Sequence, residues 1–440
     1  MNERQEKIIS FLDQKKDWVK GKDIALVMHV TTRTIRSDIE TINNQMEDGW
    51  IESSYQMGYR LHIEKKALTQ THTNGIPQTP KERCDYILKK LLSVRESHIS
   101  ELCEQVCASI YTVEQDLKTI RTRMLPDDGL GSVIGTKCYD NKGPKIMIAT
   151  HADEVGFFVR DIDENGFLKL TPVGSWWSHM LLGHNFTVVT QQGKEIKGFI
   201  GSMATHGLPQ EIRSKTVDIN DVYLDLGVAS RQEALDLGIQ IGDMVAPDTE
   251  LRRMNNPKYI AGKALDNRVS CAVGLYILER LKNKSHAPLS FAATAQEEPG
   301  LRGARTATDV MHPDLAFAID TTLAGDTPMN KNCNRLGGGV VLSMIDSNTI
   351  ASRPLIRYVE NVCKRVGIPF QYAVFADGGT DSGNIHKSFE GIVNMTLSIP
   401  IRYMHTNQSV IHEDDVEACV DLLTAIIEEM DEATFETLIS

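Results

Sequence analysis

The spacing of apolar residues divides the 440-residue chain into two regions. Near the N-terminus apolar side chains recur at helical spacing, as in the stripe of Ile8, Ile9 and Leu12. From Asp127 onward, short apolar runs typical of buried strands alternate with amphipathic helices. This alternation predicts an α/β domain with a mainly parallel sheet, preceded by small α-helical modules.

Residues 1–66 carry the pattern of a winged helix-turn-helix. One helix is predicted over residues 4–13, a second over 22–28 and a third from Thr32, while alternation in residues 49–62 predicts a two-stranded wing. The third helix turns polar residues outward, where they suit contacts with the phosphates and base edges of duplex DNA. These candidate DNA-binding residues are Arg33, Thr34, Arg36 and Ser37.

A second helix-turn-helix is predicted in residues 81–125, because its sequence repeats that of the first copy at a constant offset of 78. The core position of Ile35 is kept as Val113, but Glu114 stands where Arg36 stood. An acidic side chain there would repel phosphate, so this copy is expected to be structural or dimerising. The pair resembles the tandem winged-helix front end of bacterial sugar-operon regulators. The alternative is that both modules serve protein contacts alone.

The composition is that of an ordinary globular protein, and the apolar pattern predicts a cytoplasmic location. The net charge is -12, and 24% of the residues are charged. No apolar run approaches the roughly 18 residues of a membrane helix, and the first residues lack the apolar core of a secretion signal. The eight scattered cysteines are expected to be reduced thiols. Residues 67–80 are uncharged and contain two prolines, which predicts a linker.

Acids and imidazoles follow the apolar runs of the second region. Runs over 145–150, 289–295, 315–319 and 392–399 each lead to such residues, and one more acid precedes a helix predicted over 267–281. In an open α/β sheet, ligands bind at the carboxyl ends of the strands. The candidate site residues are His151, Asp153, Asp266, Glu297, Glu298, Asp320 and His405.

Two imidazoles and three carboxylates at one sheet edge form a ligand set for two divalent ions of the zinc, cobalt or manganese kind. A shared carboxylate can bridge two ions about 3.5 to 4 Å apart, and a further carboxylate can take a proton from water. Glu297 is the candidate for that role, and Asp153 can orient His151. Taken singly, these residues are also typical of interior histidines, solvated pairs and helix caps, so spacing alone leaves both readings open.

At these residues the sequence resembles the M42 family of metallo-aminopeptidases, the glutamyl and tetrahedral aminopeptidase group. The resemblance covers residues 128 to 440 and lies in six segments that keep the order and intervals of the family. They are THADEVG from Thr150, GKALDNR from Gly262, AQEEPGLRGA from Ala295, AIDTTLAGDTP from Ala318, GGTDSG from Gly378 and PIRYMHT from Pro400.

The resemblance implies an aminopeptidase that binds two divalent metal ions per subunit, most often zinc or cobalt, and acts on peptides. One ion would be held by His151, Asp266 and Asp320. The other would be held by Asp266, Glu298 and His405. Glu297 would act as general base and acid, and Asp153 would support His151.

The family also implies a domain plan. Residues 126–155 and 257–440 would form the catalytic domain, and residues 156–256 an inserted β domain through which subunits form homo-oligomers. Where the family begins with its own helix, this chain carries the second helix-turn-helix. A rival hypothesis is a transcription regulator whose peptidase-like half senses peptide or metal without catalysis.

Overall fold

The structure is a computed structural model that forms two compact units, Met1–Arg121 and Thr122–Ser440. It describes residues 3–15, 17–28, 30–44, 51–54, 57–61, 79, 83–84, 86–87, 90, 99–123, 128–137, 141–211, 213–281, 284–328, 334–374 and 378–439. The predicted linker over 67–80 lies outside these residues apart from Thr79. No helix within these described ranges is both long and apolar enough to cross a membrane.

The first module of unit 1 has three helices and a hairpin, as the sequence predicts. The helices pack around a core that includes Ile8, Ile24 and Ile35. Tyr59 and Val19 exchange backbone hydrogen bonds of 2.8 and 2.9 Å, which attach the hairpin to the helices. The elements are α1 (Glu3–Lys15), α2 (Gly21–Val27), α3 (Thr32–Asn44) and the antiparallel strands β1 (Ile51–Ser54) and β2 (Gly58–Leu61).

The second module contains α6 (Ile99–Gln105) and α7 (Ile110–Arg123), and its contacts repeat those of the first. Arg4 pairs with Asp38 at 2.7 Å, and Arg83 pairs with Asp116 at 2.8 Å. Hydroxyl groups of Thr31 and Thr34 lie 2.9 Å apart at the start of α3, as do those of Ser109 and Thr112 at the start of α7. The sequence repeat is therefore matched by equivalent polar contacts.

Unit 2 is built on a seven-stranded sheet of order β16-β15-β17-β14-β4-β13-β3. The four central strands are parallel, whereas the outer strands run the other way. Four of the six pairs of neighbouring strands are parallel, so the sheet is mainly parallel as expected, and its two antiparallel pairs join β3 to β13 and β15 to β17. The strands are β3 (Val133–Lys137), β4 (Ile146–His151), β13 (Leu289–Thr294), β14 (Leu315–Leu323), β15 (Val340–Ile345), β16 (Phe370–Val374) and β17 (Val393–Ile401).

Helices cover both faces of this sheet, because the buried strands are apolar on both sides. In β4, Ile146 and Ile148 join the core under one helix layer, while Met147 and Ala149 join the core under the other. The first layer contains α9 (Leu265–Leu281), α11 (Arg353–Val366), α13 (Glu413–Glu429) and α14 (Glu432–Ile439). The second contains α10 (Arg302–Met311) and α12 (Ser382–Ile385).

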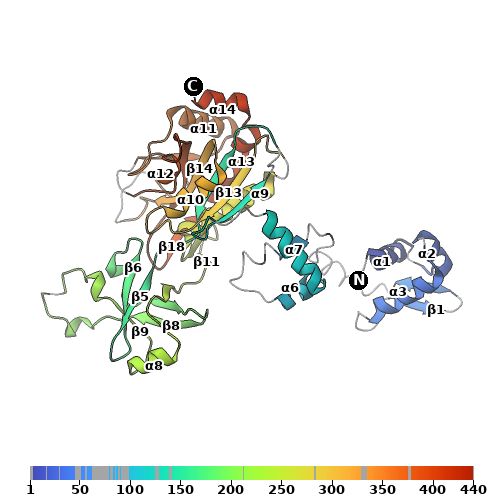
Figure 1. The fold of residues 1–440 in the computed structure, drawn as a ribbon, viewed down its shortest axis with the longest axis horizontal. Coiled ribbons are helices and arrows are strands. Elements are labelled where there is room, and N and C mark those ends of the chain that lie inside the picture. Colours follow the sequence, from blue (N-terminus) through green and yellow to red (C-terminus); the bar gives the residue numbers. More distant parts are fainter. Residues whose placement is uncertain are drawn as a thin grey trace. The chain divides into compact units, whose positions relative to one another are not determined.

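A closed six-stranded antiparallel barrel is inserted between β4 and α9 and forms a separate lobe of unit 2 (Figure 1). Its core includes Phe157 and Phe186. Its strands are β5 (Gly156–Ile162), β6 (Leu168–Val173), β7 (Asn185–Val189), β8 (Glu195–Ile200), β9 (Tyr223–Asp225) and β10 (Met244–Pro247), with η2 (Ser178–Met180), η3 (Thr205–Gly207), η4 (Ile219–Asp221) and α8 (Arg231–Asp236) between them. A small sheet of β11 (Arg252–Arg253), β12 (Tyr259–Gly262) and β18 (Ser409–His412) follows the barrel.

Candidate metal centre

The site opens where two central strands separate. β14 pairs with β4 only as far as Ala318 opposite Ala149, but it continues to pair with β17 as far as Leu323 opposite Ile401. Beyond Ala318, the side chain of Asp320 therefore faces a space next to His151. The sequence placed Asp320 after the end of a strand, whereas it lies inside β14, because pairing with β17 extends this strand.

Two segments reach this space from the small sheet, the start of α9 and the turn before β18. Gly262 in β12 pairs with Ser409 in β18, so the segments carrying Asp266 and His405 leave one pair of strands side by side. His405 has a φ of 54°, a left-handed conformation that non-glycine residues seldom adopt. Such conformations persist where the surrounding structure enforces them, and they cluster at functional sites.

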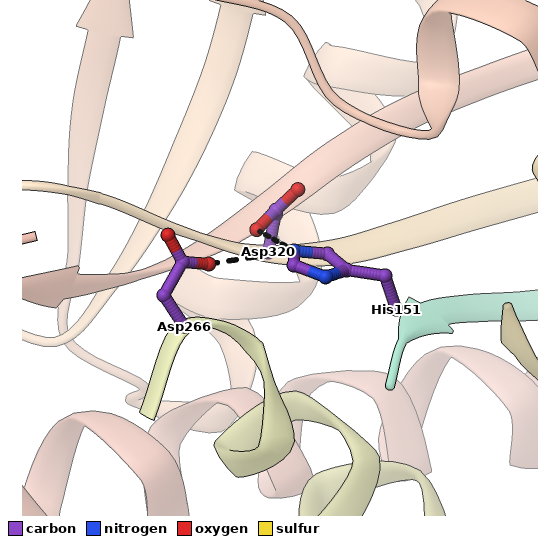
Figure 2. Close-up of side chains that lie close together, drawn as sticks. All are labelled: His151, Asp266 and Asp320. Atoms are coloured by element: carbon purple, nitrogen blue, oxygen red, sulfur yellow. Dashed lines mark ion pairs between the residues drawn. The ribbon is translucent and has the colours of Figure 1, made fainter. Parts of the chain in front are cut away.

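The predicted ligands form two groups that share Asp266, and within each group the possible ligand atoms lie within 4.8 Å of one another. Nε2 of His151 lies 3.4 Å from Oδ1 of Asp266 and 3.5 Å from Oδ1 of Asp320 (Figure 2). Nε2 of His405 lies 3.4 Å from Oδ2 of Asp266 and 3.5 Å from Oε2 of Glu298. Each oxygen of Asp266 thus faces a different imidazole.

These distances fit metal ions better than direct hydrogen bonds. N–H···O bonds are typically about 2.7 to 3.2 Å long. Two atoms that each lie about 2.0 to 2.1 Å from a tetrahedral zinc ion are about 3.3 to 3.4 Å apart. In addition, Oε1 of Glu298 is buried without a hydrogen-bond partner among the described residues. The donor set therefore fits a pair of divalent cations.

Burial and the close approach of charged groups shift the pKa values of this cluster. Burial raises the pKa of Glu298 to about 7 and the pKa of Glu297 well above its ordinary value. Burial opposes the charged form of His151, yet the carboxylates around it, chiefly Asp320, raise its pKa well above the ordinary value. Carboxylates packed this closely repel one another when ionised, so bound cations would stabilise their charged forms.

Glu297 belongs to neither ligand group, although its Oε2 lies 3.9 Å from Nε2 of His151. Its neighbour Asp153 holds this region together. One oxygen of Asp153 accepts the backbone N–H of Glu297 and the other accepts that of Glu298, both at 3.1 Å. Asp153 also lies 3.7 Å from Nδ1 of His151. The sequence indicated only the contact with His151, because backbone donors leave no signal in the residue pattern.

Asp381 is a buried acid near the site that the sequence analysis did not select. Its carboxylate accepts a hydrogen bond from Thr294, the residue of β13 that pairs with His151. Burial raises its pKa to about 7. The GGTDSG segment contained this residue, so the motif was the available signal.

On α3 of the first module, Arg33, Arg36 and Ser37 are exposed as expected. Thr34 differs from the expectation, because it is half-buried and its hydroxyl group lies 2.9 Å from that of Thr31 at the helix start. Thr31 caps the helix, because its Oγ1 also accepts the backbone N–H of Thr34 at 3.2 Å, and Thr34 packs against this cap.

On α7, the equivalent helix of the second module, Ile110 is 56% exposed and Tyr111 is 70% exposed. Glu114 is also exposed there. Comparison of the two helices therefore shows a change from a basic surface to an apolar and acidic one.

The N-terminal residues 4–60 match a helix-turn-helix (HTH) domain. The chain is also 30% identical over 118 residues to the probable licABCH operon regulator of Bacillus subtilis, an alignment that covers 24% of this chain and 18% of that protein. The structure and the comparison agree on a helix-turn-helix front end.

Residues 131–422 match the M42 glutamyl aminopeptidase family. The chain is 35% identical over 303 residues to the glutamyl aminopeptidase of Lactococcus lactis, covering 68% of this chain and 85% of that enzyme. It is 30% identical over 307 residues to the lysyl aminopeptidase of Pyrococcus furiosus, covering 69% of this chain and 86% of that enzyme.

Solved structures agree with these matches. The TET aminopeptidase of Thaumarchaeota archaeon SCGC AB-539-E09 has a TM-score of 0.68 and 32% identity, over 74% of this chain and 92% of that chain. The TET1 peptidase of Pyrococcus horikoshii, which can assemble into a tetrahedron or a large octahedral shell, has a TM-score of 0.62 and 28% identity, over 72% and 93%. The family implies divalent metal ions, and two ligand groups are present in the fold. The chain therefore belongs to the M42 glutamyl aminopeptidase family and carries an additional N-terminal helix-turn-helix domain.

Proposed function

We propose that this aminopeptidase removes N-terminal residues from short peptides with two divalent ions, zinc or cobalt, held by the five predicted ligands. The observation that carries the proposal is the sharing of Asp266, whose two oxygens each lie 3.4 Å from a different imidazole. One ion would bind His151, Asp266 and Asp320, and the other would bind Asp266, Glu298 and His405.

When bound, such ions lower the pKa of water and polarise a carbonyl group. Glu297 then takes a proton from the attacking water and returns it to the leaving amine. Its side chain suits this role because it is 9% exposed, faces His151 and belongs to neither ligand group. Asp153 fixes the backbone of Glu297 and Glu298, so the proton carrier and a ligand keep a constant separation.

Replacing Glu297 by Gln tests this assignment. Turnover of aminoacyl chromogenic amides should fall at least 100-fold, the lower range for loss of a general acid and base, while metal content stays at two ions per chain. Glu298→Gln is the matched control, because it changes the neighbouring carboxylate and should lower metal content. Unchanged turnover in Glu297→Gln would exclude Glu297 as the proton carrier.

We propose that the first module binds duplex DNA through α3. Arg33 and Arg36 are exposed on that helix, and Lys22 at the start of α2 is exposed as well. Each phosphate contact contributes about 0.9 to the salt dependence of binding. The double variant Arg33→Ala/Arg36→Ala should therefore bind duplex DNA more weakly and reduce the salt slope by about 1.8.

Tyr111→Ala/Glu114→Ala on α7 is the matched control, and we expect it to keep DNA binding. The exposed Ile110 and Tyr111 support a protein-contact role for this second module. Equal DNA affinity in the α3 variant and the wild type would contradict the proposal for the first module.

The helix-turn-helix domain favours a second candidate, a regulator that senses peptide or metal without catalysis. Glu297 argues against it, because a sensor needs the ligands but not an additional buried carboxylate beside them. Protein that binds metal and duplex DNA but releases no amide from a broad aminoacyl panel would favour the sensor. Release that depends on Glu297 would favour the enzyme.

The surface of the barrel is consistent with a homo-oligomer. Phe158 and Met244 are 42% and 51% exposed and pair across β5 and β10, which gives the barrel an apolar surface. The assembly of the similar TET1 peptidase is consistent with use of such a surface. A cytoplasmic location accords with a module that would contact DNA.

A further inference from the structure

A glycine of the inserted barrel lies close to a proposed ligand of the metal centre. A β-carbon added to Gly174, the residue after β6, would lie 2.7 Å from Oε2 of Glu298. The same oxygen is the one that lies 3.5 Å from Nε2 of His405. The carboxylate of Glu298 is therefore confined between the backbone of Gly174 and the imidazole of His405.

Little space remains into which this carboxylate could move. The side chain of Glu298 is 4% exposed, its Oε1 is buried, and its backbone N–H is held by Asp153 at 3.1 Å. Ordinary carbon–oxygen contacts are about 3.3 Å or longer. A methyl group at Gly174 would thus push Oε2 by about 0.6 Å, whereas metal–ligand distances tolerate about 0.2 Å.

The segment that carries Gly174 is firmly attached to the barrel. Val173 pairs with Gly156 at the end of β6. Nε1 of Trp176 donates a hydrogen bond of 3.2 Å to the carbonyl oxygen of Gly156, and its ring stacks on Phe157 with centroids 5.2 Å apart. Gly174 itself has a φ of +74°, which favours glycine. The barrel, rather than a loose loop, therefore sets the position of this contact.

We infer that Gly174 is a positioning residue through which the inserted barrel holds Glu298 as a ligand of the second ion. The inference rests on the proposed assignment of Glu298, His405 and Asp266 to that ion. In Gly174→Ala, the ion at His151, Asp266 and Asp320 should remain, while affinity at the second position should fall at least tenfold, the usual effect of displacing a group that orients a ligand.

The test is a measurement of cobalt binding. Equilibrium dialysis with elemental analysis gives the number of bound ions, and the absorption spectrum reports the environment of the bound cobalt. Gly183→Ala is the matched control, because Gly183 lies in the same barrel with a φ of +79° and an added β-carbon there would meet nothing within 4 Å. We expect two ions in the wild type and in Gly183→Ala, and one tightly bound ion in Gly174→Ala. Two tightly bound ions in Gly174→Ala, or the same loss in both variants, would overturn the inference.

Val155 requires a second variant, since the added β-carbon would also lie 2.6 Å from its Cγ1. The double variant Val155→Ala/Gly174→Ala removes the contact with Cγ1. Its cobalt binding is measured in the same way if Gly174→Ala does not fold. The double variant should still lose the second ion, and recovery of that ion would assign the effect to Val155 instead. Absence of bound cobalt in the wild type would count against the proposed function itself, which separates the two failures.

Discussion

Substitution of Asp153 should loosen the loop that carries both glutamates. Each of its carboxylate oxygens accepts one backbone N–H at 3.1 Å, from Glu297 and from Glu298. A hydrogen bond to a charged group contributes about 1.5 to 3 kcal/mol. Asn keeps one acceptor oxygen and Ala keeps none, so the free energy of opening this loop should fall by about 1.5 to 3 kcal/mol in Asp153→Asn and by about 3 to 6 kcal/mol in Asp153→Ala.

Hydrogen exchange of metal-free protein, followed by mass spectrometry, measures this opening directly. Since about 1.4 kcal/mol corresponds to a factor of ten, amides of the peptide over residues 295–301 should exchange about 10 to 150 times faster in Asp153→Asn. Asp153→Ala should exceed that effect. Asp163→Asn is the control, because Asp163 also accepts two backbone N–H groups but lies in a barrel turn, and it should leave this peptide unchanged.

The pH dependence of the same protection has a defined sign. Contacts with His151 and the two backbone N–H groups outweigh burial and hold the pKa of Asp153 below its ordinary value of 3.8. The stability from the ionised carboxylate is therefore present above pH 3.8 and is lost as the pH falls through the lower pKa of the folded state. Equal exchange in wild type, Asp153→Asn and Asp153→Ala at neutral pH would refute the reasoning, because the two bonds would then contribute nothing.

Three further predictions follow from other contacts. The pKa of Glu298 is about 7 without metal, so ion binding below pH 7 should release a proton. The affinity for the ion should then fall by up to tenfold for each pH unit below 7. Calorimetry in buffers of different ionisation enthalpy would detect the released proton. Gly58→Ala should disrupt the wing, since a β-carbon there would lie 2.1 Å from the carbonyl oxygen of Val19. This variant should lose DNA binding but keep amide hydrolysis. Loss of both activities together would contradict the prediction. Phe158→Glu should shift the oligomer toward smaller species in analytical ultracentrifugation, and an unchanged sedimentation profile would exclude this barrel surface from the assembly.

The sequence predicted the residues of the site better than their arrangement. Apolar runs that end in acids and imidazoles predicted the residues that lie together in the structure, because the ends of parallel strands meet at one edge of a sheet. The predicted position of Asp320 was wrong. It was expected after the end of a strand, but it lies inside β14, since pairing between β14 and β17 continues past it. Strand extension depends on a partner far along the chain, which local spacing does not encode.

Contacts made by the backbone were the least predictable. Asp153 binds the N–H groups of Glu297 and Glu298, and these donors exist in every non-proline residue. The approach of Gly174 to Glu298 joins positions in different lobes of unit 2. In the N-terminal region the repeat predicted equivalent cores, yet it did not reveal that Thr34 would contact the capping residue Thr31 instead of facing outward.

His151 and Asp266 are proposed ligands whose side chains lie 3.4 Å apart, although the whole barrel stands between them in the sequence. The pairing of the barrel's terminal strands explains this arrangement. The first barrel strand, β5, pairs with the last, β10, so the chain leaves and re-enters the catalytic layers at one place. An insertion whose ends meet places little strain on the surrounding domain. The chain then passes through β12, whose pairing with β18 aligns Asp266 with His405. Closure of the barrel is thus a condition for the site, and a change that separates β5 from β10 should disturb metal binding before it disturbs the seven-stranded sheet.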